Sequence, residues 1–269
     1  MIFDIIIIGA GPAGITTAIY AKNAGFKTLI VEVNTIGGKL NSINEIVNYP
    51  GYTKITGEQL AENMAKQIES ITIVYDKILN ITKTNDGTKI AIGAAAQYQG
   101  KTIVIATGTK PKVLDLPIPR ENISTCELCD GILCTNQNVA VVGGGNSAFT
   151  CALYLEKIAK LVTMIIRGSE PKAFMSLVEK AEQSKKINIL YNTYISKVSK
   201  SRIYLNNGIV CEPFKIFLKI GEIPNTIKTS LSEQDGVYIV GACSGLIPNQ
   251  IVTAEGDAIK KFVELAKLI

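Results

Sequence analysis

Two cysteines three residues apart are the side chains of this sequence best suited to chemistry. Cys126 and Cys129 are followed directly by Asp130, and the motif lies between two glycine-rich loops, at residues 9–14 and 143–148. Each loop follows a run of β-branched residues and opens a helix-like segment, which is the pattern of a dinucleotide-binding fold. A pair of thiols between two such folds predicts that electrons pass from a nucleotide cofactor to a disulfide.

The remaining composition excludes other kinds of active site. The chain has six cysteines and no histidine, and only Cys126 and Cys129 are close in sequence. A zinc site needs further cysteines or histidines at short spacing, so no metal site is expected. Ser-His-Asp and Cys-His catalysis are excluded because each needs a histidine. Acid–base chemistry is left to a carboxylate, tyrosine, lysine, cysteine or water. Cys134, Cys151 and Cys211 are interpreted as small core residues.

Length and charge are those of an ordinary globular enzyme. At 269 residues the chain is long enough for two domains, and its net charge of +5 is modest. Residues 5–21 carry no charge, but Gly9, Gly11, Pro12 and Gly14 interrupt them, so a buried strand followed by a helix is expected instead of a membrane span. The first residues also lack the basic region of a signal peptide. We therefore expect a cytoplasmic protein that binds neither membranes nor nucleic acid.

The first glycine loop belongs to a predicted β-α-β unit. Its strand, helix and strand are expected at residues 3–8, 13–23 and 27–32. Gly9 permits the tight turn, Gly11 lets the backbone approach a pyrophosphate, and Gly14 allows close packing of helix and strand. The free N–H groups at the start of the helix favour phosphate groups. Glu32, at the end of the second strand, is placed to accept hydrogen bonds from a ribose diol.

A second β-α-β unit has the same pattern but a different ribose position. Its strand, helix and strand are expected at residues 139–142, 147–158 and 162–166, and its loop residues that would contact a nucleotide are Gly143, Gly145, Asn146 and Ser147. Ile166 stands where Glu32 stands in the first unit, so no carboxylate is available for a ribose. Arg167 and Lys172 remain as cations for a 2′-phosphate. The pattern predicts a nucleotide-binding fold with a weak NADPH site.

Prolines indicate two places where the chain crosses between domains. The first crossing follows the strand-like residues 102–106, the second follows residues 216–221, and the prolines concerned are Pro111, Pro117, Pro119 and Pro224. A strand at 236–241 and a helix from about Thr253 then complete the first domain. The predicted fold is α/β, with two Rossmann-like nucleotide-binding domains, the second inserted into the first. The expected domains are residues 1–112 with 222–269, and residues 113–221.

The order of these motifs resembles that of the low-molecular-weight thioredoxin reductases, over nearly the whole chain. The matching segments are Gly9-Ala-Gly11-Pro-Ala-Gly14, Gly37-Gly38-Lys-Leu40, Asn48-Tyr-Pro50-Gly51, Ala106-Thr107-Gly108, Cys126-x-x-Cys129-Asp130-Gly131, Gly143-Gly-Gly145-Asn-Ser-Ala148 and Gln250-Ile-Val-Thr253-Ala254. The dithiol followed by Asp-Gly inside the second domain is specific to this family. Glutathione-reductase-type enzymes instead carry their cysteines near the first nucleotide fold and use a histidine base.

The resemblance implies a cofactor, a partner and an assembly. FAD would be held in the first domain by Gly9, Gly11, Pro12, Ala13, Gly14, Glu32, Gly38, Leu40, Asn48, Thr107, Gly108, Gly241 and Gln250. The implied partner is thioredoxin or a glutaredoxin-like protein, and the implied assembly is a homodimer. A domain rotation would present the dithiol alternately to the flavin and to its substrate. Cys129 would face the flavin, Cys126 would attack the incoming disulfide, and Asp130 would move protons.

Two departures from the family bear on the cofactor and the electron donor. Ala242 and Cys243 follow Gly241 where the family has Asp, so FAD loses one anchor. The residues from Ile166 to Gly168 replace a His-Arg-Arg signature, and Lys172 replaces a further Arg. Thioredoxin-reductase-like flavoproteins that lack the NADPH signature take electrons from reduced ferredoxin, and these departures resemble theirs. We expect reduced ferredoxin as the donor, with NADPH as the alternative.

Two other functions stay open on the same scaffold. One is a dithiol oxidase that passes electrons from a small-molecule dithiol to oxygen. The other is a non-catalytic flavin-binding protein with an inert dithiol. Both share the glycine loops and the cysteine pair with a disulfide reductase, so these motifs alone do not separate the three.

Overall fold

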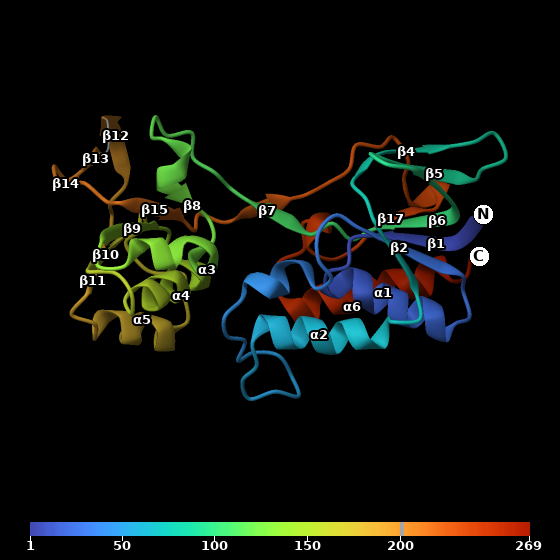
Figure 1. Cartoon of the computed structure of the whole chain (residues 1–269), viewed down its shortest axis with the longest axis horizontal. Coiled ribbons are helices and arrows are strands. Elements are labelled where there is room, and N and C mark those ends of the chain that lie inside the picture. Colours follow the sequence, from blue (N-terminus) through green and yellow to red (C-terminus); the bar gives the residue numbers. More distant parts are fainter. Residues whose placement is uncertain (200–201) are drawn as a thin grey trace. The chain divides into compact units, whose positions relative to one another are not determined.

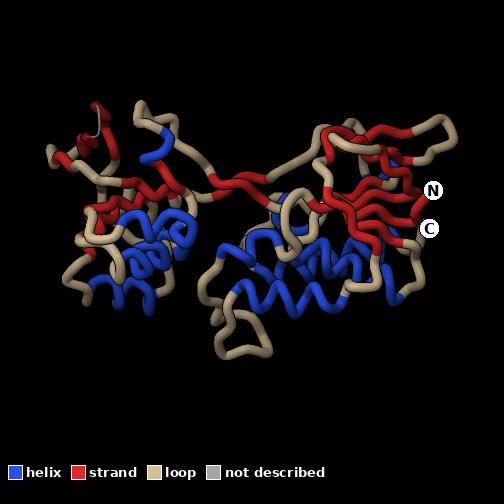
Figure 2. The backbone as a smooth tube through the Cα atoms, in the orientation of Figure 1, coloured by secondary structure: helices blue, strands red, loops and turns tan. Residues whose placement is uncertain are grey.

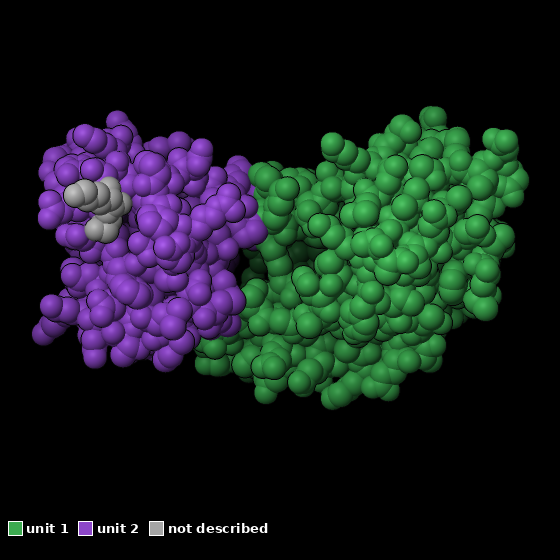
Figure 3. Space-filling model, turned by 45° about the horizontal axis from the view of Figure 1, so that its top comes forward, with its two compact units in different colours: residues 1–110, 223–269 green, residues 111–222 purple. Residues whose placement is uncertain are grey.

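Two short strands mark where the chain leaves one folding unit and returns to it. The structure is a computed structural model that describes residues 1–199 and 202–269. Its two units are residues 1–110 with 223–269, and residues 111–222 (Figure 3). Strands β7 (Thr109–Pro111) and β16 (Glu222–Pro224) carry the two crossings and pair with each other. The crossings expected from the proline pattern lie at residues 112–113 and 221–222.

The first unit is built on a mixed sheet in the order β3-β2-β1-β6-β5-β4, with β17 also paired to β6 (Figure 1). The long strand β6 pairs with β5 through its first half, in antiparallel orientation, and with β17 through its second half, in parallel orientation. The strands are β1 Ile2–Ile8, β2 Thr28–Glu32, β3 Thr72–Tyr75, β4 Ile78–Lys83, β5 Lys89–Gly93, β6 Gln97–Ile105 and β17 Val237–Ile239.

Both faces of this sheet are covered, which explains why β1 is apolar at nearly every position. Ile5 and Ile7 pack against the helical layer, whereas Ile6 and Ile8 pack against the strand pair β4 and β5. Figure 2 shows the helices of this unit gathered on one face of its strands. The helices are α1 Pro12–Asn23, α2 Gly57–Gln67 and α6 Ile251–Leu265, and the 3-10 turns are η1 Gly38–Ser42, η4 Glu233–Asp235 and η5 Gly241–Ser244.

The second unit repeats these layers on a parallel sheet in the order β11-β10-β9-β15-β8. Val139 and Val141 of β9 face the helices, whereas Ala140 faces the three-stranded sheet β12-β13-β14. The strands are β8 Ile123–Ser124, β9 Asn138–Val142, β10 Leu161–Ile165, β11 Ile187–Leu190, β12 Ile195–Ser199, β13 Arg202–Leu205, β14 Val210–Cys211 and β15 Lys215–Leu218. The helices and 3-10 turns are η2 Arg120–Asn122, α3 Glu127–Asp130, η3 Gly131–Cys134, α4 Asn146–Leu155 and α5 Met175–Glu182.

Two helix boundaries differ from those expected. Helix α4 ends at Leu155 and not at Ile158. The Ile158 N–H donates to the Leu155 carbonyl, three residues back, and the Ile158 carbonyl accepts the Asn136 N–H at 3.0 Å. Helix α6 begins at Ile251, two residues before Thr253, because Gln250 and Thr253 close a capping box at its N-terminus. The uncharged residues 5–21 divide into β1 and α1. Throughout residues 1–199 and 202–269, no helix has the length and apolar composition needed to cross a membrane.

Helix α1 lies unusually close to the end of β1, because Gly14 has no side chain. A Cβ atom at Gly14 would lie 1.9 Å from the carbonyl oxygen of Gly9. Gly256, in the exposed part of α6, is a matched helical glycine whose Cβ would meet nothing within 4 Å. Substitutions at these two positions therefore distinguish the effect of helix propensity on stability from the effect of a steric clash.

Replacing each of these glycines with alanine should change stability in opposite directions. Gly256→Ala should raise the free energy of unfolding by about 0.4–1 kcal/mol, since alanine loses less backbone entropy in a helix. Gly14→Ala should lower it by about 1–3 kcal/mol, because the added methyl group forces α1 away from β1. Thermal unfolding followed by circular dichroism measures both. A Gly14→Ala protein at least as stable as the wild type would contradict the close approach of α1 and β1.

Candidate functional site

The first glycine loop forms a cradle at the carboxyl end of β1. Gly9 has φ +104°, and a Cβ there would lie 2.5 Å from the carbonyl oxygen of Ala106, so two loops touch through their backbones. Gly11 precedes α1, its Cβ would meet nothing within 4 Å, and no side chain caps the helix. Pro12 occupies the first turn of α1. The first N–H groups of α1 are therefore available to an anion that approaches past Gly11.

Glu32 is held rigidly beside this cradle, at the end of β2. Its carboxylate accepts the N–H of Ala10 at 2.6 Å and the N–H of Asn34 at 2.8 Å. The side chain is buried at 5 % exposure, so these charge-assisted hydrogen bonds fix its orientation. A carboxylate in this position fits the ribose end of a dinucleotide whose pyrophosphate lies on α1.

Two further glycines pack closely against the cradle. A Cβ at Gly38 would lie 3.5 Å from Cα of Gly11, and a Cβ at Gly241 would lie 2.6 Å from Cβ of Ala13. Both have positive φ, of +53° and +70°, a conformation that favours glycine. The structure therefore brings the start of η1 and the start of η5 against the first glycine loop, as a shared cofactor site requires.

Hydrogen bonds hold most of the other residues that are expected to contact FAD. The Asn48 amide donates to Oε1 of Gln250 at 3.0 Å, which joins two segments far apart in sequence. The Thr107 hydroxyl bonds to the carbonyl of Asn225, and the carbonyl of Gly108 accepts the Asn225 N–H at 2.9 Å. Leu40 differs, because its side chain is 2 % exposed and packs in the helical core. Only its backbone is left for a cofactor.

Gly241, at the start of η5, is tied to α6 by another carboxylate. The Gly241 N–H donates to Oδ2 of Asp257 at 2.7 Å. Cys243 is buried, and its Sγ lies 3.1 Å from the carbonyl oxygen of Val240. Burial raises the pKa of this thiol, so it stays protonated. No motif marks Asp257, since its contact depends on α6 lying beside Gly241.

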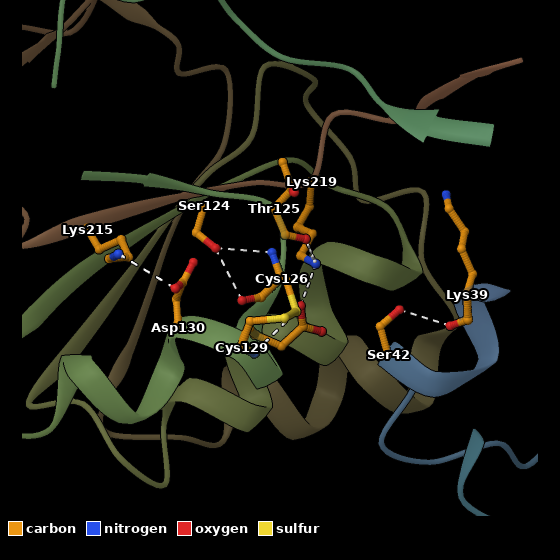
Figure 4. The surroundings of a disulfide bond; sticks show 10 residues. Lys39, Ser42, Ser124, Thr125, Cys126, Cys129, Asp130, Lys215 and Lys219 are labelled. Carbon is orange, nitrogen blue, oxygen red and sulfur yellow. Dashed lines mark hydrogen bonds and ion pairs between the residues drawn. A yellow bond between two sulfur atoms is a disulfide. The ribbon is translucent and has the colours of Figure 1, made fainter. Parts of the chain in front are cut away.

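In the second unit, Cys126 and Cys129 form a disulfide with their Cα atoms 5.4 Å apart (Figure 4). Sγ of Cys126 accepts the Cys129 N–H at 3.2 Å, at the start of α3. The buried Ser124 hydroxyl accepts the Cys126 N–H and donates to the Cys126 carbonyl, both at 3.1 Å. A Cβ at Gly131 would lie 2.9 Å from the ring of Tyr154, so this glycine lets the segment pack on α4. The disulfide therefore sits in a fixed backbone frame.

Two lysines, one at the start of β15 and one directly after its end, contact acids of the disulfide motif, and sequence patterns did not single them out. Lys215 begins β15, and its Nζ lies 4.0 Å from Oδ1 of Asp130. Lys219 follows β15 by one residue, bonds to the carboxylate of Glu127 and donates to the Thr125 carbonyl at 2.7 Å. The available signal was a pair of lysines that bracket the apolar residues 216–218.

The other thiols of this unit are not arranged for chemistry. Burial raises the pKa of Cys134, Cys151 and Cys211, so their reactive thiolate forms are disfavoured. Over the described residues, no cluster of three His, Cys, Asp or Glu side chains could hold a metal ion. The disulfide is therefore the redox group that the unit offers.

The second glycine loop has the backbone of a nucleotide-binding loop, but an apolar side chain lies beside it. A Cβ at Gly143 would lie 2.2 Å from the Lys219 carbonyl oxygen, and one at Gly145 would meet nothing within 4 Å. Gly144 packs under Ile166, since a Cβ there would lie 2.7 Å from Cγ2 of that side chain. Ile166 is 3 % exposed and covers the end of β10, where Glu32 stands in the first unit.

The loop that follows β10 folds back over this glycine loop. The Lys172 N–H donates to the Gly144 carbonyl at 2.7 Å, and the Phe174 N–H donates to the Asn146 side chain at 2.8 Å. Ser147 lies in the first turn of α4, whose N-terminus no side chain caps. Arg167 and Lys172 are exposed, and Glu170 lies between them in the chain. The cradle for a pyrophosphate is present, but its surroundings carry little positive charge.

Known proteins are similar to this chain over nearly its whole length. The family described as pyridine nucleotide-disulphide oxidoreductase matches residues 3–258. A thioredoxin reductase of Peptoclostridium litorale is 32 % identical over 307 aligned residues, covering 100 % of this chain and 97 % of that protein. One of Peptoclostridium acidaminophilum is 33 % identical over 259 residues, covering 93 % and 79 %.

Solved structures confirm the predicted fold of two Rossmann-like domains. The thioredoxin reductase of Lactococcus lactis has a TM-score of 0.89 at 30 % identity, with 98 % of each chain covered. That of T. acidophilum has a TM-score of 0.88 at 26 % identity, again with 98 % of each chain covered. The chain therefore belongs to the pyridine nucleotide-disulphide oxidoreductase family, among the low-molecular-weight thioredoxin reductases, and is an FAD-binding oxidoreductase.

Proposed function

We propose that this flavoprotein reduces the disulfide of thioredoxin or of a glutaredoxin-like protein through Cys126 and Cys129. The observation that carries the proposal is the closed disulfide, held by Ser124 and by its own backbone inside a nucleotide-binding fold. The names of the relatives support the same substrate class. We also propose a homodimer, from the family resemblance, and a cytoplasmic location, to which four free cysteines are suited.

The residues of the first unit fit FAD. Gly9, Gly11, Pro12, Ala13 and Gly14 would hold its pyrophosphate on α1, and Glu32 would accept hydrogen bonds from its ribose. Gly38, Thr107, Gly108, Gly241 and the Asn48–Gln250 pair would line the remainder. Bound FAD supplies the two electrons that break the disulfide.

The cysteines would then perform thiol–disulfide exchange. Two electrons and two protons convert the disulfide into two thiols, of which the attacking one reacts as its thiolate. We assign the attack on the partner disulfide to Cys126, which gives a mixed disulfide, and its resolution to Cys129, which releases the reduced partner. Sγ of Cys126 already accepts the Cys129 N–H, a bond that favours negative charge on this sulfur. Asp130 is the acid that we propose moves the proton.

An exposed apolar surface beside the disulfide supports a protein as the substrate. Ile132 and Leu133 follow Cys129 by three and four residues, and they are 66 % and 60 % exposed. Large apolar side chains left in solvent together are typical of a docking surface. A small dithiol would gain nothing from them.

The second nucleotide site leads us to propose reduced ferredoxin, or a similar carrier, as the electron donor. A 2′-phosphate carries close to two negative charges and is normally held by several Arg or Lys side chains. Here Arg167 and Lys172 supply the positive charge, Glu170 lies between them in the chain, and Ile166 cannot pair a ribose hydroxyl. The net charge of +5 favours an acidic protein carrier.

Removal of the Glu32 carboxylate should weaken FAD binding. Glu32→Ala loses a charge-assisted hydrogen bond, so retention should fall by about 1–3 kcal/mol, or about 5- to 150-fold in Kd. Fluorescence titration of the reconstituted apoprotein measures the affinity, and Glu58→Ala, on the exposed side of α2, is the control. Unchanged affinity in Glu32→Ala would exclude the ribose contact. A wild-type protein that takes up no flavin would end the whole proposal.

Single cysteine variants should reveal which sulfur faces the flavin. Cys129→Ser should abolish the long-wavelength absorbance that a thiolate beside a flavin produces. Cys126→Ser should keep that absorbance, because the Cys129 thiolate is then permanently free. Both variants should lose reduction of thioredoxin while the flavin still accepts electrons. The reverse pattern in anaerobic absorbance spectra would exchange the two roles.

Reduction of the flavin should depend strongly on the donor. Loss of one or two charge-assisted contacts, at about 1.5–3 kcal/mol each, should weaken NADPH binding by roughly one to four orders of magnitude. We expect slow flavin reduction by NADPH, slower still by NADH, and efficient reduction by ferredoxin that declines as salt is added. Stopped-flow absorbance compares the three donors. Rapid reduction at micromolar NADPH that Arg167→Ala abolishes would establish NADPH as the donor.

A further inference from the structure

A charged pair lies inside the disulfide motif itself. Glu127 stands between the two cysteines, and its carboxylate bonds to Nζ of Lys219. The side chains are 14 % and 13 % exposed, so water screens the pair poorly. Lys219 also donates to the carbonyl of Thr125, the residue before Cys126 (Figure 4). One ammonium group therefore binds the backbone on one side of Cys126 and the side chain on the other.

Stability alone does not explain such a pair. Burying two charges costs about as much as their attraction returns, and an apolar pair of similar volume is often at least as stable. The position of the pair suggests a role in the chemistry. When the disulfide is reduced, the sulfur–sulfur bond breaks, two electrons enter, and one sulfur can remain a thiolate while the other takes a proton. A new negative charge then appears one or two residues from the Glu127 carboxylate.

Among the described residues, charged side chains of α3 form two ion pairs. On α3 the charged side chains are Glu127 and Asp130, and on the neighbouring β15 segment they are Lys219 and Lys215, each paired with one of those acids. The neighbouring thiols Cys134 and Cys151 stay neutral, because burial raises the pKa of each. The balance between the Glu127 and Lys219 charges therefore has a direct influence on the energy of the thiolate.

We infer that Lys219 is a positioning residue that acts through Glu127 and sets the reduction potential of the Cys126–Cys129 couple. Lys219 neutralises a carboxylate that would otherwise oppose the thiolate, and it holds that carboxylate in place. The inference rests on the proposed redox role of the two cysteines. The inference predicts the direction of two effects. Removing the charge of Glu127 and removing the charge of Lys219 should shift the reduction potential of the couple in opposite directions.

The test measures the couple directly in the full-length FAD-bound protein. Wild type, Glu127→Gln, Lys219→Met and the double variant are equilibrated with dithiothreitol buffers of defined ratio and quenched with acid. Alkylation and mass spectrometry then give the reduced fraction of the Cys126–Cys129 peptide. Glu127→Gln should favour the dithiol at least threefold, because Lys219 then faces the thiolate alone. Lys219→Met should favour the disulfide at least threefold, and the double variant should lie within twofold of wild type.

Two controls separate charge from structure. Lys219→Arg keeps the charge, so the ratio of dithiol to disulfide should stay at its wild-type value, although the side chain is altered. Glu212→Gln changes the exposed Arg202–Glu212 pair of the same unit and should leave the ratio unchanged. Loosening of α3 alone would shift both single variants in the same direction, or neither, and any pattern other than opposite shifts overturns the inference. A wild-type pair that does not equilibrate with the buffer at all would instead refute the proposed function.

Discussion

The architecture depends on direct contact between backbones at places where side chains are missing. At the end of β1, Gly9 meets the carbonyl of Ala106 and Gly14 meets the carbonyl of Gly9. At the end of β9, Gly143 meets the carbonyl of Lys219 in the same manner. The Gly14 contact fixes where α1 starts relative to β1, and the other two hold each glycine loop against a neighbouring strand end, so the free N–H groups of the helix keep their direction. The cofactor cradle and the frame of the disulfide both follow from this geometry.

The two units have similar glycine-loop backbones but different side chains around them. The first unit completes its cradle with a buried, hydrogen-bonded Glu32, which suits a ribose. The second covers the equivalent strand end with Ile166, and a largely buried ion pair, Glu127 with Lys219, lies instead at its disulfide motif. A duplicated fold thus keeps its strand and helix ends, while the side chains around those ends determine what each unit can bind or react with.

Features with local causes could be predicted from the sequence, and features with distant causes could not. Both glycine loops, Glu32 and the cysteine pair were visible because spacing along the chain determines them. The partners of the disulfide were not visible: Lys219 reaches Glu127 across 92 residues, and Asp257 reaches Gly241 only because α6 returns to the first unit. At Leu40, a motif position expected at the cofactor, the side chain lies in the core, and the motif did not indicate that only the backbone is left for a cofactor. Helix ends shifted by two or three residues where capping bonds, and not periodicity, decided them.

The divided pairing of β6 has a consequence for the order in which the chain folds. Its second half needs β17, and α1 packs against α6, so the first unit lacks a strand and a helix until residues 237–265 have been synthesised. Residues 111–222 form a continuous segment and possess their complete core earlier. Synthesis from the N-terminus therefore favours maturation of the disulfide-bearing unit first, while the open edge of β6 and the bare face of α1 wait for their partners. During that interval the nascent chain exposes an unpaired strand edge, which favours aggregation, so the yield of folded protein depends on β17 and α6 joining the first unit.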